Sequence, residues 1–212
     1  MSRQSELRAQ IVRLGALLYN RQLAHGSAGN LSARLEDGSY LITPTNCCLG
    51  MLHADQISHV AADGTLLDGD PPSKESFFHM AVYEERPQAG AVVHLHSTYS
   101  VAVSCMCHAD PANVLPPLTA YHVMKVGQLP LIDYHRPGDR KLAEAVRAAA
   151  RSNHAMLMAN HGPIVSAASL EQAIWTYEEL EETAKLFFLL GDRRLSPLNA
   201  EQIADLNAHF PS

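Results

Sequence analysis

The chain has 212 residues, of which 47% are apolar and 18% charged, and its formal net charge is −6. This length and this mixture predict a globular chain with a sizeable core and argue against disorder. The acidic balance, without any basic block, excludes wholesale nucleic-acid binding, and no run reaches the ~20 apolar residues of a membrane span.

The first ten residues are polar and of mixed charge, which is unlike a signal peptide. The four cysteines occur as an adjacent pair and as a pair separated by one residue, at Cys47, Cys48, Cys105 and Cys107. Neither spacing is typical of a disulfide framework or of a zinc knuckle. We therefore expect free thiols and a cytoplasmic protein.

The first half of the chain predicts a helix, two hairpins and a second helix. Residues 3–24 carry apolar side chains at helical spacing, and this helix is expected to end near His25. Two runs then turn at the dipeptides Asp37–Gly38 and Asp63–Gly64, which is typical of hairpins. Ser73 follows two prolines and is expected to be the N-cap of a helix within residues 71–87.

The second half alternates strands and helices. Residues 91–97 predict a strand, residues 97–107 a helix and residues 128–134 another strand. Asp139 is expected to cap a helix that reaches about residue 151, and residues 154–167 predict two strands joined by a turn. Ser169 and Gln172 predict a capping box at the start of a long helix that ends at Gly191, and a short helix follows Asn199.

Helices and strands therefore interleave without a strict βαβ rhythm, and hairpins are frequent. This pattern predicts an α/β fold with a central mixed or mainly antiparallel sheet covered by helices. The chain shows no internal repeat, low-complexity segment or linker, so we expect a single domain over residues 1–212.

The strand A-V-V-H-L-H-S, residues 91–97, carries two histidines separated by one residue. Side chains on a strand alternate between its faces, so His94 and His96 are expected on the same face. That spacing suits two imidazole ligands of one metal ion. Taken alone, it equally suits two unrelated core histidines that are each hydrogen-bonded.

A third histidine, His161, stands in the turn A-N-H-G at the polar end of another apolar strand. Three histidine ligands leave one coordination position open, which is the arrangement of a catalytic zinc site. A nearby carboxylate would serve as base or as a displaceable ligand, and Glu75, two residues after Ser73, is the candidate.

Three turns rich in small residues have the chemistry to approach a phosphate closely: G-S-A-G-N (26–30), T-P-T-N (43–46) and P-S-K-E (72–75). In the last of them Ser73 and Lys74 offer a hydroxyl and a positive charge near a predicted helix N-terminus. For each turn taken alone, ordinary loop chemistry is the favoured interpretation. Only their occurrence together with the histidines favours a binding site.

The motifs G-S-A-G-N-L-S, I-T-P-T, P-S-K-E, V-V-H-L-H-S and A-N-H-G occur in this order along the chain. In this order and spacing they resemble the class II aldolase/adducin family, over about residues 5–190. Closer similarity to the family's decarboxylases of phosphorylated 3-oxo acids lies in C-L-G (48–50), H-L-H-S-T-Y-S (94–100), Y-H-R-P-G-D (134–139) and E-E-L-E-E-T-A-K-L (178–186).

The resemblance implies an α/β/α sandwich around a mainly antiparallel sheet, assembled as a homotetramer with sites between subunits. The family's zinc ligands match His94, His96 and His161, and its catalytic acid/base, which can also approach the metal, matches Glu75. The phosphate-binding positions match Gly29, Asn30, Thr45, Asn46, Ser73 and Lys74.

Two departures from the family's aldolases stand out. The aldolases have glycine after T-P-T, where this chain has Asn46, and they use a tyrosine near the C-terminus that residues 192–212 lack. The missing tyrosine argues against an aldol reaction and fits a reaction without an aldehyde partner. Tyr121 stands near the place of another catalytic tyrosine of the family.

The resemblance therefore implies a zinc-dependent carbon–carbon lyase. Its substrate would be a 3-oxo-tetronate 4-phosphate, of either the D-erythro or the L-threo series, which loses carbon dioxide through a metal-stabilised enediolate to give dihydroxyacetone phosphate. A sugar-phosphate aldolase (fuculose- or ribulose-phosphate type) or a 4-epimerase is the alternative on the same scaffold. A non-catalytic protein, like the adducin head domain, would be expected to have lost metal ligands, whereas this chain keeps all of them.

The acidic run of residues 178–182 has a simpler interpretation as a solvated helix face. Glu181 stands four residues before Lys185, which is the spacing of a helical ion pair.

Overall fold

The computed structural model describes residues 2–136 and 138–210. Pro137, within the 134–139 motif, and both ends of the predicted 1–212 domain lie outside the described residues. Eight strands form one sheet in the order β4-β3-β2-β1-β5-β8-β7-β6. Their bounds are β1 Asn30–Arg34, β2 Tyr40–Ile42, β3 Ser58–Val60, β4 Leu66–Asp68, β5 Ala91–His94, β6 Leu131–Ile132, β7 Ala155–Met158 and β8 Gly162–Ala167.

All neighbouring strands of this sheet run antiparallel except β6 and β7, which are parallel. The predicted α/β fold with a mainly antiparallel sheet is thereby confirmed. Both predicted hairpins are also present, as β1–β2 around Asp37–Gly38 and as β3–β4 around Asp63–Gly64.

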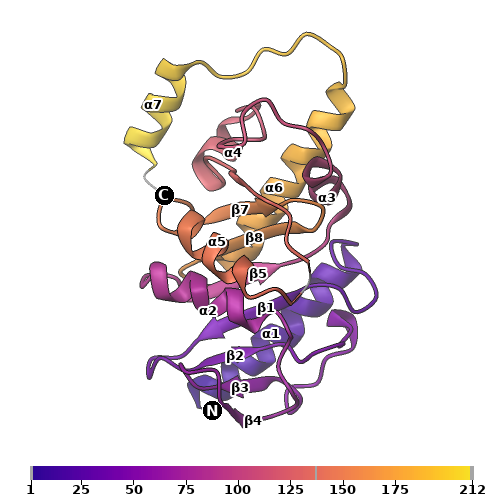
Figure 1. The fold of residues 1–212 in the computed structure, drawn as a ribbon, viewed down its shortest axis with the longest axis vertical. Coiled ribbons are helices and arrows are strands. Elements are labelled where there is room, and N and C mark those ends of the chain that lie inside the picture. The colour runs from indigo at the N-terminus through magenta and orange to yellow at the C-terminus, as the bar shows by residue number, and fades with distance from the viewer. Residues whose placement is uncertain (1, 137, 211–212) are drawn as a thin grey trace.

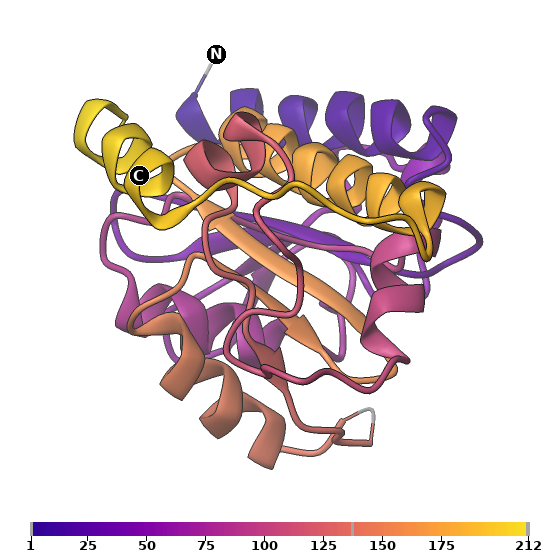
Figure 2. The ribbon, with the colours of Figure 1, turned by 90° about the horizontal axis from the view of Figure 1, so that it is seen from above.

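Helices cover both faces of the sheet, so the molecule has three layers (Figures 1 and 2). α1 and α6 lie on one face, and α2 and α5 lie on the other, as the view from above shows (Figure 2). The helices are α1 Arg3–Asn20, α2 Ser76–Glu85, α3 Thr98–Ser104, α4 Ala120–Lys125, α5 Lys141–Ala150, α6 Leu170–Leu190 and α7 Ala200–His209, with a 3₁₀ turn η1 at Leu49–Met51.

The alternation of side chains along β5 divides the core in two. Val93 and Leu95 belong to the apolar cluster under α1 and α6, whereas Val92 belongs to the cluster under α2 and α5. His94 shares the face of Val92 by the period of two, and its ring meets Phe78 of α2 edge-on, with ring centroids 5.3 Å apart. The central strand therefore directs its histidine toward α2.

Several helix boundaries differ from those predicted. Ser73 is not an N-cap, because α2 begins at Ser76 with Glu75 in the capping position. The Ser73 hydroxyl instead accepts from the backbone N–H of Glu75 at 3.2 Å and so closes a turn ahead of the helix. α5 likewise begins at Lys141, whose N–H donates to the Asp139 carboxylate at 3.0 Å.

Other predicted boundaries are confirmed. The side chain of Ser169 caps α6 by accepting from the Gln172 N–H, and Gly191 ends the helix with a positive φ of 53°. Asn199 and Gln202 form a capping box at the start of α7. The predicted end of the first helix near His25 is wrong, because α1 ends at Asn20.

Glu181 contradicts the interpretation of the acidic run as a solvated face. It is only 5% exposed, and its two carboxylate oxygens accept from the backbone N–H groups of Tyr99 and Ser100, each at 2.8 Å. Those N–H groups belong to the first turn of α3, where donors lack partners within the helix. Lys185 pairs with Glu182 instead, at 3.4 Å. α6 thus anchors the helix that directly follows the His94–His96 segment.

We expect Glu181→Ala to destabilise the fold by about 2–3 kcal/mol, because two buried N–H groups at the start of α3 lose a charged acceptor. Urea unfolding monitored by circular dichroism measures this loss. Glu182→Ala is the matched control, since that side chain is 64% exposed and should change stability by less than about 0.5 kcal/mol. Equal effects of the two substitutions would contradict the anchoring role of Glu181.

Candidate metal centre and active site

Three histidines and one glutamate meet at one end of β5. One ligand atom from each of Glu75, His94, His96 and His161 lies within 4.8 Å of the others. The Nε2 atoms of His94 and His96 are 2.9 Å apart. The Glu75 carboxylate lies 3.5 Å from the Nε2 of His94 and 3.2 Å from the Nε2 of His161. The structure therefore brings together the four predicted metal ligands.

The sheet register accounts for this convergence. His94 is the last residue of β5 and pairs with Ile164 of β8, while His161 occupies the turn between β7 and β8. Asn160 takes a left-handed conformation, with a φ of 55°, which turns the chain just before His161. His96 lies beyond the end of β5, yet its ring shares one face with that of His94 as predicted.

Two glycines let neighbouring loops approach the backbone that joins the two histidines. A Cβ at Gly29, which has a φ of +85°, would stand 2.8 Å from the carbonyl oxygen of His94. A Cβ at Gly162 would stand 2.6 Å from the carbonyl oxygen of Leu95. Both distances are shorter than real Cβ contacts, so side chains at these positions would push the β5 end away from its neighbours.

The hydrogen bonds of His94 define which of its nitrogens faces the cluster. Its Nδ1 lies 2.9 Å from the carbonyl oxygen of Pro163, an acceptor, so Nδ1 carries the proton. Nε2 of the neutral ring therefore presents a lone pair to the cluster. A backbone or carboxylate acceptor on the far nitrogen is typical of histidines that ligate a metal.

The electrostatics of the cluster also suit a cation. Burial lowers the pKa of His94 well below its ordinary value of 6.5, and burial, with His161 nearby, lowers the pKa of His96 to about 4. Burial alone would raise the pKa of the Glu75 carboxyl, but His94 and His161, together with the Asn30 amide, hold it well below its usual range. Neutral imidazoles and an ionised carboxylate are the protonation states that bind metals.

Zinc fits this donor set. Three imidazole nitrogens and one carboxylate match a catalytic zinc site in which the carboxylate can yield its place to water or substrate. The Nε2 lone pair of His94 points toward Nε2 of His96 at 2.9 Å, and a cation between the two rings would be bound by both nitrogens. Manganese or cobalt accept the same donors, so the ligand set indicates a divalent metal without selecting one.

The three predicted phosphate turns also lie together. The backbone N–H of Thr45 donates to the carbonyl of Pro71 at 2.9 Å, and that of Ser73 donates to the carbonyl of Thr43 at 3.2 Å. The Asn30 amide donates to the Ser73 hydroxyl at 3.2 Å. Turns that are far apart in the sequence therefore form one continuous surface that ends at Glu75.

Asn46 takes a left-handed conformation, with a φ of 56°. Asparagine tolerates this conformation better than most other residues with a side chain, so the left-handed backbone that glycine permits is also accessible to Asn46. Lys74 is exposed beside the buried Ser73. The structure thus juxtaposes Gly29, Asn30, Thr45, Ser73 and their neighbours, whose contact with a phosphate remains a prediction.

Tyr121 is not joined to this cluster. It is 60% exposed on α4, where the Lys125 ammonium lies 5.9 Å from the centre of its ring. Among the described residues, no hydrogen bond connects Tyr121 to Glu75 or to the three histidines. Its catalytic role remains a prediction, and within one copy of the chain the structure gives it no support.

Sequence reasoning missed two contacts that shape the site. One is the Pro163 carbonyl that orients His94. Every residue has a backbone carbonyl, so the sequence does not indicate which of them contacts His94. The other is His79, which is fully buried and lies 2.5 Å from the side-chain oxygen of Asn30. His79 is a polar residue within the apolar stretch 77–82, one helical turn after Glu75, and this position could have indicated a buried polar contact near the site.

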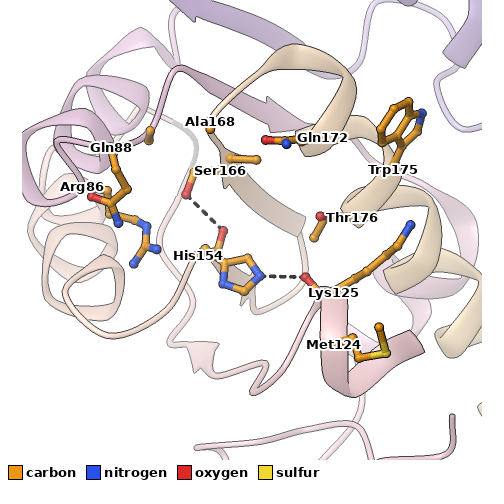
Figure 3. A pocket seen from close by; sticks show the side chains of 12 residues that line it. Arg86, Gln88, Met124, Lys125, His154, Ser166, Ala168, Gln172, Trp175 and Thr176 are labelled. Carbon is orange, nitrogen blue, oxygen red and sulfur yellow. Dashed lines mark hydrogen bonds between the residues drawn. The ribbon is translucent and has the colours of Figure 1, made fainter. Parts of the chain in front are cut away.

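A cavity of about 460 Å³ lies at the opposite end of the β5–β8 pair from the histidines. Figure 3 shows Arg86, Lys125, His154 and Trp175 around it. None of the predicted metal or phosphate residues lines it. Within the described residues, no helix is both long and apolar enough to span a membrane.

Comparisons with known proteins identify the family of this chain. Residues 9–188 match the model of the class II aldolase and adducin N-terminal domain. The chain is 50% identical to 3-oxo-tetronate 4-phosphate decarboxylase of Escherichia coli over 205 residues, which are 97% of each protein. It is 35% identical to L-fuculose phosphate aldolase of Escherichia coli over 86% of this chain and 83% of that one.

A solved structure has the same fold. The crystal structure of YgbL from Escherichia coli superposes with a TM-score of 0.95 at 49% identity, covering 97% of this chain and 99% of that one.

We expect the purified protein to hold about one divalent metal per chain and His94→Ala to lose it, because a buried ligand and its orienting hydrogen bond disappear together. Elemental analysis after dialysis measures the metal. His53→Ala, at an exposed position outside the cluster, is the control and should keep the metal. Full occupancy in folded His94→Ala would show that the ion binds elsewhere.

Proposed function

The chain belongs to the class II aldolase and adducin family, and we propose that it decarboxylates a 3-oxo-tetronate 4-phosphate to dihydroxyacetone phosphate and carbon dioxide. The observation that carries this proposal is the meeting of three histidines and Glu75 beside the joined turns 26–30, 43–46 and 72–75. Relatives that share about half of their residues with this chain over nearly its whole length are decarboxylases of this substrate.

Decarboxylation is favoured over aldol cleavage for two reasons. The fuculose-phosphate aldolases share only about a third of their residues with this chain. Residues 192–212 also contain no tyrosine that could donate a proton to an aldehyde. Both reactions generate an electron pair beside a ketone, and decarboxylation releases carbon dioxide where the aldol reaction releases an aldehyde. A decarboxylase therefore needs no group dedicated to the aldehyde.

His94, His96 and His161 would hold the metal, with Glu75 as a fourth, displaceable ligand. When bound, a divalent metal such as zinc supplies Lewis-acid polarisation of the substrate's ketone oxygen. The protein's own groups would carry out the remaining steps. They would bind the phosphate, orient the carboxylate that leaves and transfer one proton.

The joined turns would hold the phosphate. The turns around Gly29 and Asn46, the Ser73 hydroxyl and the exposed Lys74 ammonium would supply donors and one positive charge. Binding energy from this remote group can hold the reacting carbons in position beside Glu75.

Glu75 would manage the proton. Loss of carbon dioxide leaves the electron pair of the broken bond at C2, conjugated with the C3 ketone, and one proton must then reach C2. Glu75 is ionised and only 19% exposed, and it lies beside His161 and Asn30. It can take a proton from a substrate hydroxyl or from water and return it to C2, as a general acid and base does.

We further propose that the working protein is a cytoplasmic homotetramer. The free state of all four cysteines fits a reducing compartment. Exposed aromatic and large aliphatic side chains, among them Tyr121, Trp175 and Leu189, fit burial between subunits. In such an assembly an exposed Tyr121 of one subunit could face the site of another.

We expect carbon dioxide release from 3-oxo-tetronate 4-phosphate that a strong chelator abolishes and that added Zn²⁺ restores. Labelled substrate of both the D-erythro and the L-threo series measures the release. A parallel assay tests condensation of dihydroxyacetone phosphate with lactaldehyde. Condensation without carbon dioxide release would contradict the decarboxylase proposal and indicate an aldolase. Conversion of a pentulose phosphate to its epimer would indicate an epimerase.

Glu75→Gln should lower kcat for carbon dioxide release by about 10²–10⁴-fold, because the amide cannot carry the proton. The measurement is steady-state kinetics on protein of verified metal content. Glu182→Gln, at a position 64% exposed on α6, is the matched control and should keep wild-type kinetics. A Glu75→Gln variant with wild-type kcat would remove Glu75 from the mechanism.

A further inference from the structure

A line of buried hydrogen bonds leads from Glu75 into the layer between the sheet and α2. The Asn30 amide nitrogen donates to Oε2 of Glu75 at 2.8 Å, and Oδ1 of Asn30 lies 2.5 Å from Nε2 of His79. Nδ1 of His79 lies 2.8 Å from the Ser32 hydroxyl, which lies 2.8 Å from the hydroxyl of Tyr83. His79 and Ser32 are 0% exposed, Asn30 3% and Tyr83 6%.

Chemistry allows one polarity along this line. An ionised Glu75 only accepts, so Asn30 must turn its NH₂ group toward Glu75 and its carbonyl toward His79. His79 must then donate from Nε2, which leaves Nδ1 as an acceptor. Ser32 donates to that Nδ1 and accepts from the Tyr83 hydroxyl. Every member of the line is satisfied when His79 is neutral and carries its proton on Nε2.

We propose that His79 is a positioning residue that holds the Asn30 amide so that its N–H groups face Glu75 and Ser73. This inference rests on the proposed function, because it concerns the group assigned there to proton transfer. Without a donor at His79 the carbonyl of Asn30 loses its fixed partner, and the amide can rotate to present oxygen to a carboxylate. Burial lowers the pKa of His79 to about 3, which agrees with a neutral ring.

The same line is not a proton path to Glu75. A carboxamide does not exchange protons readily along its O–C–N unit, so Asn30 separates Glu75 from the imidazole. Tyr83 also has its pKa raised by burial and remains a neutral donor. The line therefore orients Glu75 and does not supply it with protons.

Two substitutions at His79 separate positioning from packing. His79→Leu fills the space without a donor, whereas His79→Gln can place an amide N–H near the position of Nε2. We expect kcat to fall about 10–100-fold in His79→Leu with a smaller change in KM, and His79→Gln to restore most of the loss. The kcat values of both variants are compared with wild type at equal metal content. Urea unfolding of each variant measures any change in stability separately.

A double-mutant cycle tests whether His79 acts through Asn30. If it does, His79→Leu should add less than about 2-fold to the loss of kcat in Asn30→Ala, since the amide that it orients is already absent. The proposal would be overturned if the loss of kcat in the double variant equalled the product of the losses in the two single variants. It would also be overturned by folded, metal-loaded His79→Leu with wild-type kcat, or by His79→Gln as slow as His79→Leu.

A readout independent of turnover completes the test. Nitrogen-15 NMR of the histidine side chains should show His79 protonated at Nε2 and unprotonated at Nδ1, with the signal identified by its loss in His79→Gln. The opposite tautomer would overturn the proposal even if His79→Leu fails to fold. If the wild-type protein releases no carbon dioxide, the proposed function fails, and the tautomer still decides the positioning role.

Discussion

The structure depends on one constraint: a half-buried carboxylate and three imidazoles must face each other where the central strands of an apolar sheet end. His94 is 0% exposed, and Glu75 retains only 19% of its side-chain exposure. Such groups would repel or rearrange unless each is held by a further contact. The Pro163 carbonyl holds His94, the Asn30 amide holds Glu75, and the end of β5 is confined between Gly29 and Gly162.

That constraint also explains features remote from the cluster. Residues 94–97 leave the sheet immediately after His94, so the direction of His96 depends on where α3 begins. Glu181 of α6 fixes that beginning, and the Tyr177 hydroxyl of the same helix donates to the Leu95 carbonyl at 3.0 Å. A long helix on one face of the sheet therefore sets the position of a ligand that faces the other side.

Periodicity and turn chemistry were sufficient to predict most of the elements and the convergence of Glu75 with the three histidines. The H-x-H spacing places two rings on one face whatever surrounds the strand, and that geometry is present. Predicted helix boundaries were wrong where a side chain can either cap a helix or close a turn. Ser73, for example, closes a turn instead of capping α2. The prediction that Glu181 lies on a solvated helix face was wrong because its partners are backbone N–H groups 81 or 82 residues away. Local charge spacing cannot reveal such partners.

Asn30 links the two halves of the proposed site. Its amide nitrogen contacts both Ser73, on the surface formed by the turns, and Glu75, at the histidine cluster. In the proposed site, binding of a phosphate near Ser73 and the orientation of Glu75 would therefore share one donor group. Because the carbonyl of this amide contacts the buried His79, its orientation is set from inside the protein before the substrate arrives. An orientation fixed in advance costs nothing at the moment of reaction, which is the condition under which electrostatic stabilisation is most effective.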